Sequence, residues 1–184
     1  RGNEKNPQMQ RLYGVAFATQ EDLDQYLENL EQAKLRDHRK VGKEHDLYTV
    51  SPLVGAGLPL FTPRGTVLRD LMANYSNQLR QNRGFEKVWT PHITKTDLYE
   101  ASGHWAKFGD ELFLVTRQET RDKMALKPMN CPHHCEIYKV RPRSYKELPL
   151  RLAEFGTVYR YEQSGELHGL TRVRGFTQDD AHIF

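Results

Sequence analysis

Residues 171–184, T-R-V-R-G-F-T-Q-D-D-A-H-I-F, form the most informative stretch of this chain, because its side chains alternate by chemistry. With the two-residue period of a strand, polar and aromatic groups fall on one face and mostly small or apolar groups on the other. The first face holds Arg172, Arg174, Phe176, Gln178, Asp180 and His182, and the second holds Val173, Gly175, Thr177, Ala181 and Ile183. Such a polar face is a poor core and indicates the floor of a site for an anionic, ring-bearing ligand. The alternative is the solvated face of an edge strand.

The preceding segment favours the binding site over the edge strand. Residues 150–162, L-R-L-A-E-F-G-T-V-Y-R-Y-E, are rich in strand formers, and Arg160 and Glu162 project to the same side. Between the two strands, Q-S-G-E-L-H-G-L is too long for a two-residue turn and predicts a hairpin with a long, glycine-hinged loop. Arg160 can fork onto a phosphate, Phe176 can stack under a purine and Glu162 can accept from an exocyclic amine. The pattern therefore predicts nucleoside triphosphate binding without a glycine-rich phosphate loop.

Several ordered motifs carry a resemblance that spans nearly the whole chain. The strand F-G-T-V-Y-R-Y-E, the loop S-G-E-L-H-G-L and the strand R-V-R-G-F-T-Q-D-D-A-H-I-F resemble motif 2 of class II aminoacyl-tRNA synthetases, specifically the threonyl-tRNA synthetase family. K-P-M-N-C-P-H-H at 127–134 and G-H-W at 103–105 are similar to the same family, and G-F-E-K-V-W-T-P at 84–91 looks like motif 1. The resemblance implies an α/β (α+β) fold in which a class II antiparallel sheet is flanked by helices.

The resemblance also implies a reaction: ATP-dependent activation of L-threonine, followed by its ligation to tRNA(Thr). It assigns Arg160 to the α-phosphate and the reacting carboxylate, and Arg172 to the triphosphate. Glu162 is assigned to the adenine amine and Phe176 to stacking against adenine. Magnesium (Mg2+) is expected with the ATP phosphates, without assigned protein ligands. His104 lies in a glycine-flanked turn. Such a histidine is usually a structural hydrogen-bonding group, but the resemblance gives it a role in transferring the aminoacyl group to tRNA.

The cysteines of the chain, Cys131 and Cys135, suggest a metal site. Pro132 favours the first helical position, which predicts Cys131 at the helix N-cap, where the helix dipole favours a thiolate. A local zinc cluster that adds His133 and His134 is one alternative. Another is that Cys135 packs, inert, in an apolar stripe. The resemblance implies Cys131 and His182 as zinc (Zn2+) ligands, with a third ligand after residue 184.

Zinc accounts for specificity in this interpretation. Threonine and valine are isosteres, which an apolar pocket separates only weakly. A zinc ion with three protein ligands keeps an open position, and the resemblance implies that threonine's amine and hydroxyl coordinate there. It further implies that Met129, Gln178 and Asp180 contact the substrate threonine.

The rest of the chain is predicted to surround this site. We expect residues 1–20, with a strand-like segment at 11–17, to be the tail of a preceding editing-side module. A linker helix is expected at 21–42, after a capping-box signal at Thr19. Residues 43–184 are expected to form a partial class II catalytic domain with motifs 1 and 2. Motif 3 and its arginine are absent, so the domain is expected to be incomplete at its C-terminus.

A long amphipathic helix and a strand make up the motif 1 region. The apolar stripe of this helix, which ends at Gly84, comprises Val67, Leu68, Leu71, Met72, Tyr75 and Leu79. The strand that follows contains Pro91, so it should lie at a sheet edge or change partners there. The resemblance implies a homodimer through residues 66–91, although the stripe fits a core equally well. Short strands are expected at 58–61, 112–115 and 124–126, the last two joined by a charged turn.

The composition of the chain limits which partners, locations and functions it can have. The net charge of +3 and pI near 8.8 permit a nucleic-acid partner without demonstrating one. No apolar stretch reaches the length of a membrane span and no signal peptide opens the chain, so we expect a cytoplasmic protein without membrane partners. A truncated relative that binds ATP or RNA without aminoacylation is the alternative function. A class II synthetase for another amino acid, such as proline or serine, is disfavoured by Cys131 together with His182.

Overall fold

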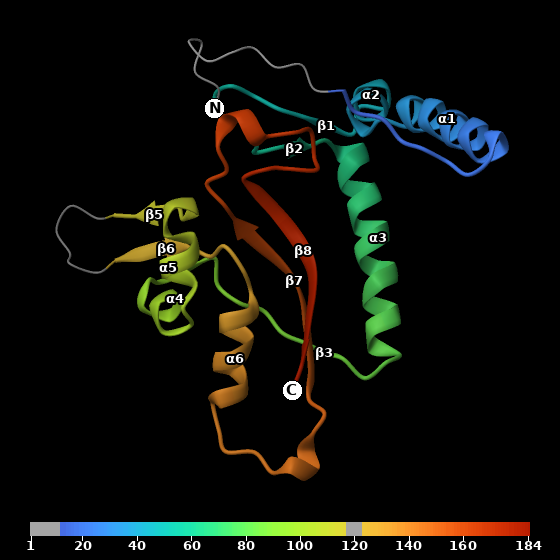
Figure 1. The fold of residues 1–184 in the computed structure, drawn as a ribbon. Helices are drawn as coiled ribbons and strands as arrows, with labels where there is room; N and C mark the ends of the chain where they lie inside the picture. Colours follow the sequence, from blue (N-terminus) through green and yellow to red (C-terminus); the bar gives the residue numbers. More distant parts are fainter. Residues whose placement is uncertain (1–11, 117–122) are drawn as a thin grey trace.

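The computed structural model describes residues 12–116 and 123–184 and contains both helices and sheets (Figure 1). The helices are α1 (Gln20–Leu35), α2 (His38–Glu44), α3 (Pro63–Gln81), α4 (Asp97–Ala101), α5 (His104–Phe108) and α6 (Cys131–Lys139). The strands are β1 (Tyr48–Thr49), β2 (Leu60–Phe61), β3 (Glu86–Lys87), β4 (Ile93–Lys95), β5 (Leu114–Val115), β6 (Met124–Leu126), β7 (Arg151–Tyr159) and β8 (Gly175–Ile183). Single 3-10 turns lie at Gly109–Glu111, Tyr145–Glu147 and Ser164–Glu166. This composition confirms the predicted mixed fold with antiparallel sheets and flanking helices.

The long hairpin β7–β8 is the centre of the molecule (Figure 1). Its strands pair antiparallel from Arg151↔Ile183 to Tyr159↔Gly175, which sets the even-numbered residues of both strands on one face. Along β8 the even-numbered side chains are half-buried, whereas the odd-numbered ones from Thr177 onward are exposed. The predicted polar face is thus present from Phe176 to His182. Arg172 and Arg174 precede the strand, because Arg172 closes an isolated bridge with His168 and the Arg174 amide donates to the Gly57 carbonyl.

Helices cover both faces of this hairpin. On the odd-numbered face, Arg80 of α3 forms an ion pair with Asp179 at 2.9 Å, and its guanidinium lies 4.4 Å from the centre of the Phe155 ring. On the even-numbered face, His134 of α6 contacts Glu154 at 2.9 Å. Figure 1 shows α3 and α6 on opposite sides of the two strands. The polar face of β8 therefore lies beneath the beginning of α6.

The segment after α3 changes sheets. β3 pairs in parallel with the edge of β7, with Glu86 opposite Leu152. After Pro91, β4 instead joins a second sheet, of order β4-β6-β5, in which all pairs are antiparallel. A change of partner near Pro91 was predicted, and it is confirmed. The charged turn expected between β5 and β6 lies largely in residues 117–122, outside the described residues.

The N-terminal region differs from the sequence-based expectation. α1 begins as predicted, since the Thr19 hydroxyl accepts from the Asp22 amide at 3.2 Å. The expected single helix to residue 42 is instead two, because Asp37 leaves the helical conformation with ψ 119° and caps α2 by accepting from the Arg39 amide. The strand-like segment 11–17 is not a strand from residue 12 onward; Leu12 is 97% exposed and has no sheet partner among the described residues. Residues 1–11 lie outside them.

The helix α3 forms as predicted. The Thr62 hydroxyl accepts from the Gly65 amide, and Pro63 takes the first helical position. The stretch after the helix turns at Gly84, whose φ of 74° suits glycine. The apolar stripe of α3 is not buried in the described part of the chain: Val67, Leu71, Met72 and Tyr75 are each at least 60% exposed. No helix of the described part of the chain is both long and apolar enough to span a bilayer.

Candidate metal and nucleotide site

Cys131, Asp180 and His182 come together where α6 begins above β8. One potential ligand atom from each residue lies within 4.8 Å of the others. Asp180 and His182 are two apart on the even-numbered face of β8, and Cys131 is the first residue of α6. The N-cap is Asn130, so the prediction of Cys131 at the N-cap is off by one position.

These three donors fit a zinc ion in their chemistry. Thiolate, carboxylate and imidazole are the ligands zinc takes, and bonds of about 2.0–2.3 Å bring tetrahedral ligands to roughly 3.5 Å from one another. Burial lowers the pKa of His182 and keeps its imidazole neutral, as a ligand requires. The thiol differs from expectation: burial, with the Asp180 carboxylate beside it, raises the pKa of Cys131. The metal-free thiol is therefore protonated, and metal binding must release that proton.

The local Cys/His cluster that the sequence left open has no support in the described residues. No grouping at metal-ligand distances there includes Cys135, His133 or His134. His134 contacts Glu154 and His182, and the His133 ring lies edge-on to Tyr99, 6.4 Å between centroids.

Asn130 and Gly156 bring α6 close to the strands. A Cβ atom at Gly156 would lie only 2.4 Å from the Asn130 side-chain amide, so only glycine lets that amide lie flat on β7. From there the Asn130 amide nitrogen donates to Asp180 at 3.0 Å. Sequence analysis did not select Asn130, although a glycine inside a strand was a signal of such close approach.

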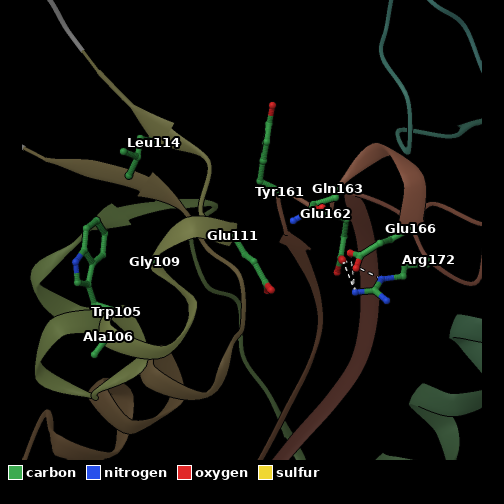
Figure 2. Close-up of a pocket in the computed structure, with 10 residues that line it drawn as sticks. All are labelled: Trp105, Ala106, Gly109, Glu111, Leu114, Tyr161, Glu162, Gln163, Glu166 and Arg172. Atoms are coloured by element: carbon green, nitrogen blue, oxygen red, sulfur yellow. Dashed lines mark hydrogen bonds and ion pairs between the residues drawn. The ribbon is translucent and has the colours of Figure 1, made fainter. Parts of the chain in front are cut away.

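A cavity of about 850 Å³ lies beyond the end of β7 (Figure 2). Its lining includes Trp105, Glu162 and Arg172. The Arg172 guanidinium donates to Glu162 at 2.9 Å and pairs with Glu166 at 3.1 Å (Figure 2). Two residues predicted to contact different parts of ATP are thus brought together and pair with each other. In this structure the Arg172 guanidinium is engaged by two carboxylates.

Arg160 follows the end of β7 and contacts both the Pro128 carbonyl and the Phe176 ring. Its Nε donates to the Pro128 carbonyl at 3.2 Å, and its guanidinium lies 5.4 Å from the Phe176 ring centre. Arg160 and Met129 both line a smaller cavity of about 90 Å³. Phe176 also borders a separate cavity of about 350 Å³ on the side of β2. The arrangement brings Arg160 together with both Phe176 and Met129.

The remaining predicted residues lie around these groups. Gln178 is half-buried on β8, opposite Gly156 and one step along the same face from Asp180. His104 is the first residue of α5, directly after the turn at Gly103 with φ 74°; it was expected in a glycine-flanked turn. Its Nδ1 is 2.7 Å from the Ser102 hydroxyl, and its neighbour Trp105 lines the large cavity.

Glu111 is a further lining residue that sequence analysis missed. It borders both the large and the small cavity, and its carbonyl accepts from the Tyr161 amide at 2.7 Å. A single acidic residue in a loop gives no sequence signal of such a position.

Comparisons with known proteins identify relatives of this chain. The model of the tRNA synthetase class II core domain (G, H, P, S and T) covers residues 113–184. Threonine–tRNA ligases from Deinococcus radiodurans and Porphyromonas gingivalis are 62% and 60% identical to the chain over its full length. The chain spans 28% of the length of these relatives.

Comparison with solved structures also finds class II synthetases. The RNA binding domain of threonyl-tRNA synthetase from Cryptosporidium parvum is 42% identical with a TM-score of 0.76, covering 81% of this chain and 37% of that one. Giardia lamblia prolyl-tRNA synthetase shares the fold at 22% identity, with a TM-score of 0.70 over 79% of this chain and 30% of that one. Over its full length the chain is similar to threonine–tRNA ligases, and residues 113–184 match the class II tRNA synthetase core domain.

Proposed function

We propose that the protein containing this chain activates L-threonine with ATP and transfers it to tRNA(Thr). One observation carries the proposal: candidate metal ligands and candidate nucleotide-binding side chains lie next to each other along the even-numbered face of β7 and β8. The donors Cys131, Asp180 and His182 lie within 4.8 Å of one another, and Arg160 lies against Phe176 farther along the same face. A metal-assisted amino-acid site and a nucleotide site next to each other suit a reaction that joins the two substrates.

In the activation step, a carboxylate oxygen of threonine attacks the α-phosphorus of ATP, and pyrophosphate leaves. Such a step depends on positioning and charge neutralisation more than on covalent catalysis. We assign Arg160 to hold the α-phosphate and the attacking carboxylate, through the paired nitrogens of its guanidinium. Arg172 leaves Glu162 to bind the triphosphate, which frees Glu162 to accept from the adenine amine. Phe176 stacks on adenine, and Mg2+ accompanies the phosphates.

In the amino-acid half of the site, we assign Cys131 and His182 to hold zinc. A bound zinc supplies an open coordination position that takes the amine and hydroxyl of threonine but offers nothing to the methyl group of valine. Asp180 and Gln178 hold the amine and hydroxyl by hydrogen bonds, and Met129 contacts the substrate. Asp180 is also close enough to be a ligand. The bond it accepts from Asn130 supports the assignment to substrate, because that bond orients the carboxylate.

The remaining assignments concern tRNA, assembly and location. His104, beside the large cavity, is proposed to assist transfer of the aminoacyl group to tRNA. A homodimer through residues 66–91 is supported by the exposed apolar stripe of α3. Translation takes place in the cytoplasm, and we propose that location. A truncated ATP- or RNA-binding relative without aminoacylation is the alternative, and the tests below distinguish it.

The role of Arg160 can be tested by threonine-dependent ATP–pyrophosphate exchange in the full-length protein. Arg160→Lys keeps the charge but loses the two-point contact, so we expect exchange to slow by about a hundredfold, the scale of removing one transition-state donor. Arg151→Lys is the matched control, because Arg151 lies at the far end of β7 on the opposite face and should leave exchange unchanged. Wild-type exchange by Arg160→Lys would refute the assignment.

A further inference from the structure

A buried hydrogen-bonded chain runs from the candidate metal site into the core. His182 Nδ1 lies 2.8 Å from His134 Nδ1, and His134 Nε2 lies 2.9 Å from Glu154 Oε1. His134 is 0% exposed and Glu154 is 2% exposed. Neither residue belongs to the amino-acid or nucleotide site described above, and burying such groups is costly unless their hydrogen bonds are satisfied.

The hydrogen-bond donors around Glu154 fix the direction of this chain. Lys127 Nζ donates to the Thr90 hydroxyl at 2.5 Å, so that hydroxyl directs its own hydrogen to Glu154 Oε1, 2.8 Å away. The Thr90 amide donates to Glu154 Oε2 at 3.2 Å, and Lys127 Nζ lies 3.9 Å from Oε1. Glu154 is therefore surrounded by donors and acts as a carboxylate that only accepts.

The protonation of Glu154 agrees with this geometry. Burial alone would raise the pKa of Glu154, but hydrogen bonds from His134 and Thr90 and the Lys127 charge outweigh burial and hold the pKa below its ordinary value. His134 contacts Glu154 from α6, so it must donate to the carboxylate. His134 therefore carries a hydrogen on Nε2.

The hydrogen bond between His134 and His182 can be assigned in the same way. His182 Nδ1 is occupied by His134 Nδ1, so Nε2 is the nitrogen left to bind a metal, and a ligand that binds through Nε2 carries its hydrogen on Nδ1 and donates it to His134. A neutral His182 with its hydrogen on Nδ1 keeps a lone pair on Nε2. That lone pair is what a metal ligand needs, and the opposite tautomer would present a hydrogen in its place.

We propose that His134 and Glu154 are positioning residues that hold His182 in the tautomer and ring orientation required of a metal ligand. The proposal rests on the metal site proposed above and adds the device that prepares one of its ligands. Thr90 and Lys127 complete the device by keeping Glu154 an acceptor. Outer partners of this kind typically change metal affinity by about 10–100-fold.

The experiment compares substitutions at neighbouring buried histidines of α6 in the full-length protein. His134→Leu removes the acceptor for His182, and we expect the zinc dissociation constant, measured by chelator competition, to rise about 10–100-fold. His133→Leu is the matched control, since His133 is 8% exposed on the same helix and its ring nitrogens have no hydrogen-bond partner among the described residues. It should leave zinc affinity unchanged. His134→Asn keeps an acceptor oxygen near the position of Nδ1 and should restore most of the affinity.

A spectroscopic measurement separates positioning from general loss of structure. In metal-free protein labelled with 15N-histidine, His182, assigned from His182→Ala, should show a protonated Nδ1 and an unprotonated Nε2. His134→Leu should shift it toward the Nε2-protonated form, and His133→Leu should not. A wild-type His182 protonated at Nε2 overturns the proposal, as does equal zinc affinity in the two leucine variants. If zinc does not depend on His182 at all, the metal site fails, while the 15N spectra still decide the tautomer.

Discussion

At the scale of single residues, the chemistry depends on what α6 presents to β8. Cys131 arrives from the helix, whereas Asp180 and His182 come from the strand, and their ligand atoms lie within 4.8 Å of one another. Only a folded chain can form this group, because the cysteine and the histidine are far apart in sequence. The protonated state of the Cys131 thiol in the metal-free protein means that zinc binding should release a proton and weaken on acidification.

The metal assignment predicts a specific set of zinc contents. Cys131→Ser and His182→Ala should each remove most of the zinc from the full-length protein, measured by elemental analysis after dialysis, because each removes a ligand. Cys135→Ser is the control and should keep zinc, since Cys135 is half-buried on the same helix but outside the cluster. Asp180→Asn should keep zinc and lose threonine activation, consistent with a substrate contact. Loss of zinc only in Cys135→Ser would favour the local cluster instead.

The sequence predicted which residues belong to the site better than it predicted the contacts between them. Period-two alternation found Phe176 to His182 on one face, because side chains alternate in any strand. It did not find the pairing of Arg172 with Glu162 and Glu166, which depends on the loop conformation. It also missed Glu154 and its hydrogen bond with His134, because a buried hydrogen-bond network has no local sequence signature.

At the scale of elements, α3 has two different faces. Arg80 and Ser76 hold one face against β8 through Asp179. The other face exposes the apolar stripe of Val67, Leu71, Met72 and Tyr75. The amphipathic pattern predicted this helix, but the pattern is the same for a core and an interface. The exposure of the stripe in the described part of the chain favours an interface.

The stripe predicts the assembly state. Leu71→Glu would place a carboxylate in an apolar interface, so we expect the homodimer of the full-length protein to weaken on the order of 100-fold. Leu27→Glu is the matched control: Leu27 is 48% exposed on α1, outside the stripe. Sedimentation velocity over a range of concentrations measures both. A dimer equally tight in wild type and Leu71→Glu would place the interface elsewhere.

At the scale of the whole molecule, the β7–β8 hairpin carries both the proposed amino-acid site and the proposed nucleotide site. One end of its even-numbered face carries the candidate metal ligands under α6, and the other leads to the large cavity beyond β7. The mixed fold and the change of sheet at Pro91 followed from sequence, because proline and strand periodicity act locally. The break between α1 and α2 did not, since Asp37 caps a new helix inside a continuous polar stretch.

The most direct measurement of the central claim is ATP–pyrophosphate exchange by the full-length protein with threonine or valine, at matched zinc, in wild type and His182→Ala. If one strand face supplies both metal-based selection and activation, wild type should exchange rapidly with threonine and far more slowly with valine. His182→Ala should lose threonine-dependent exchange together with zinc. Wild-type protein that binds ATP and zinc but supports exchange with neither amino acid would contradict the account and favour a nucleotide-binding relative without aminoacylation.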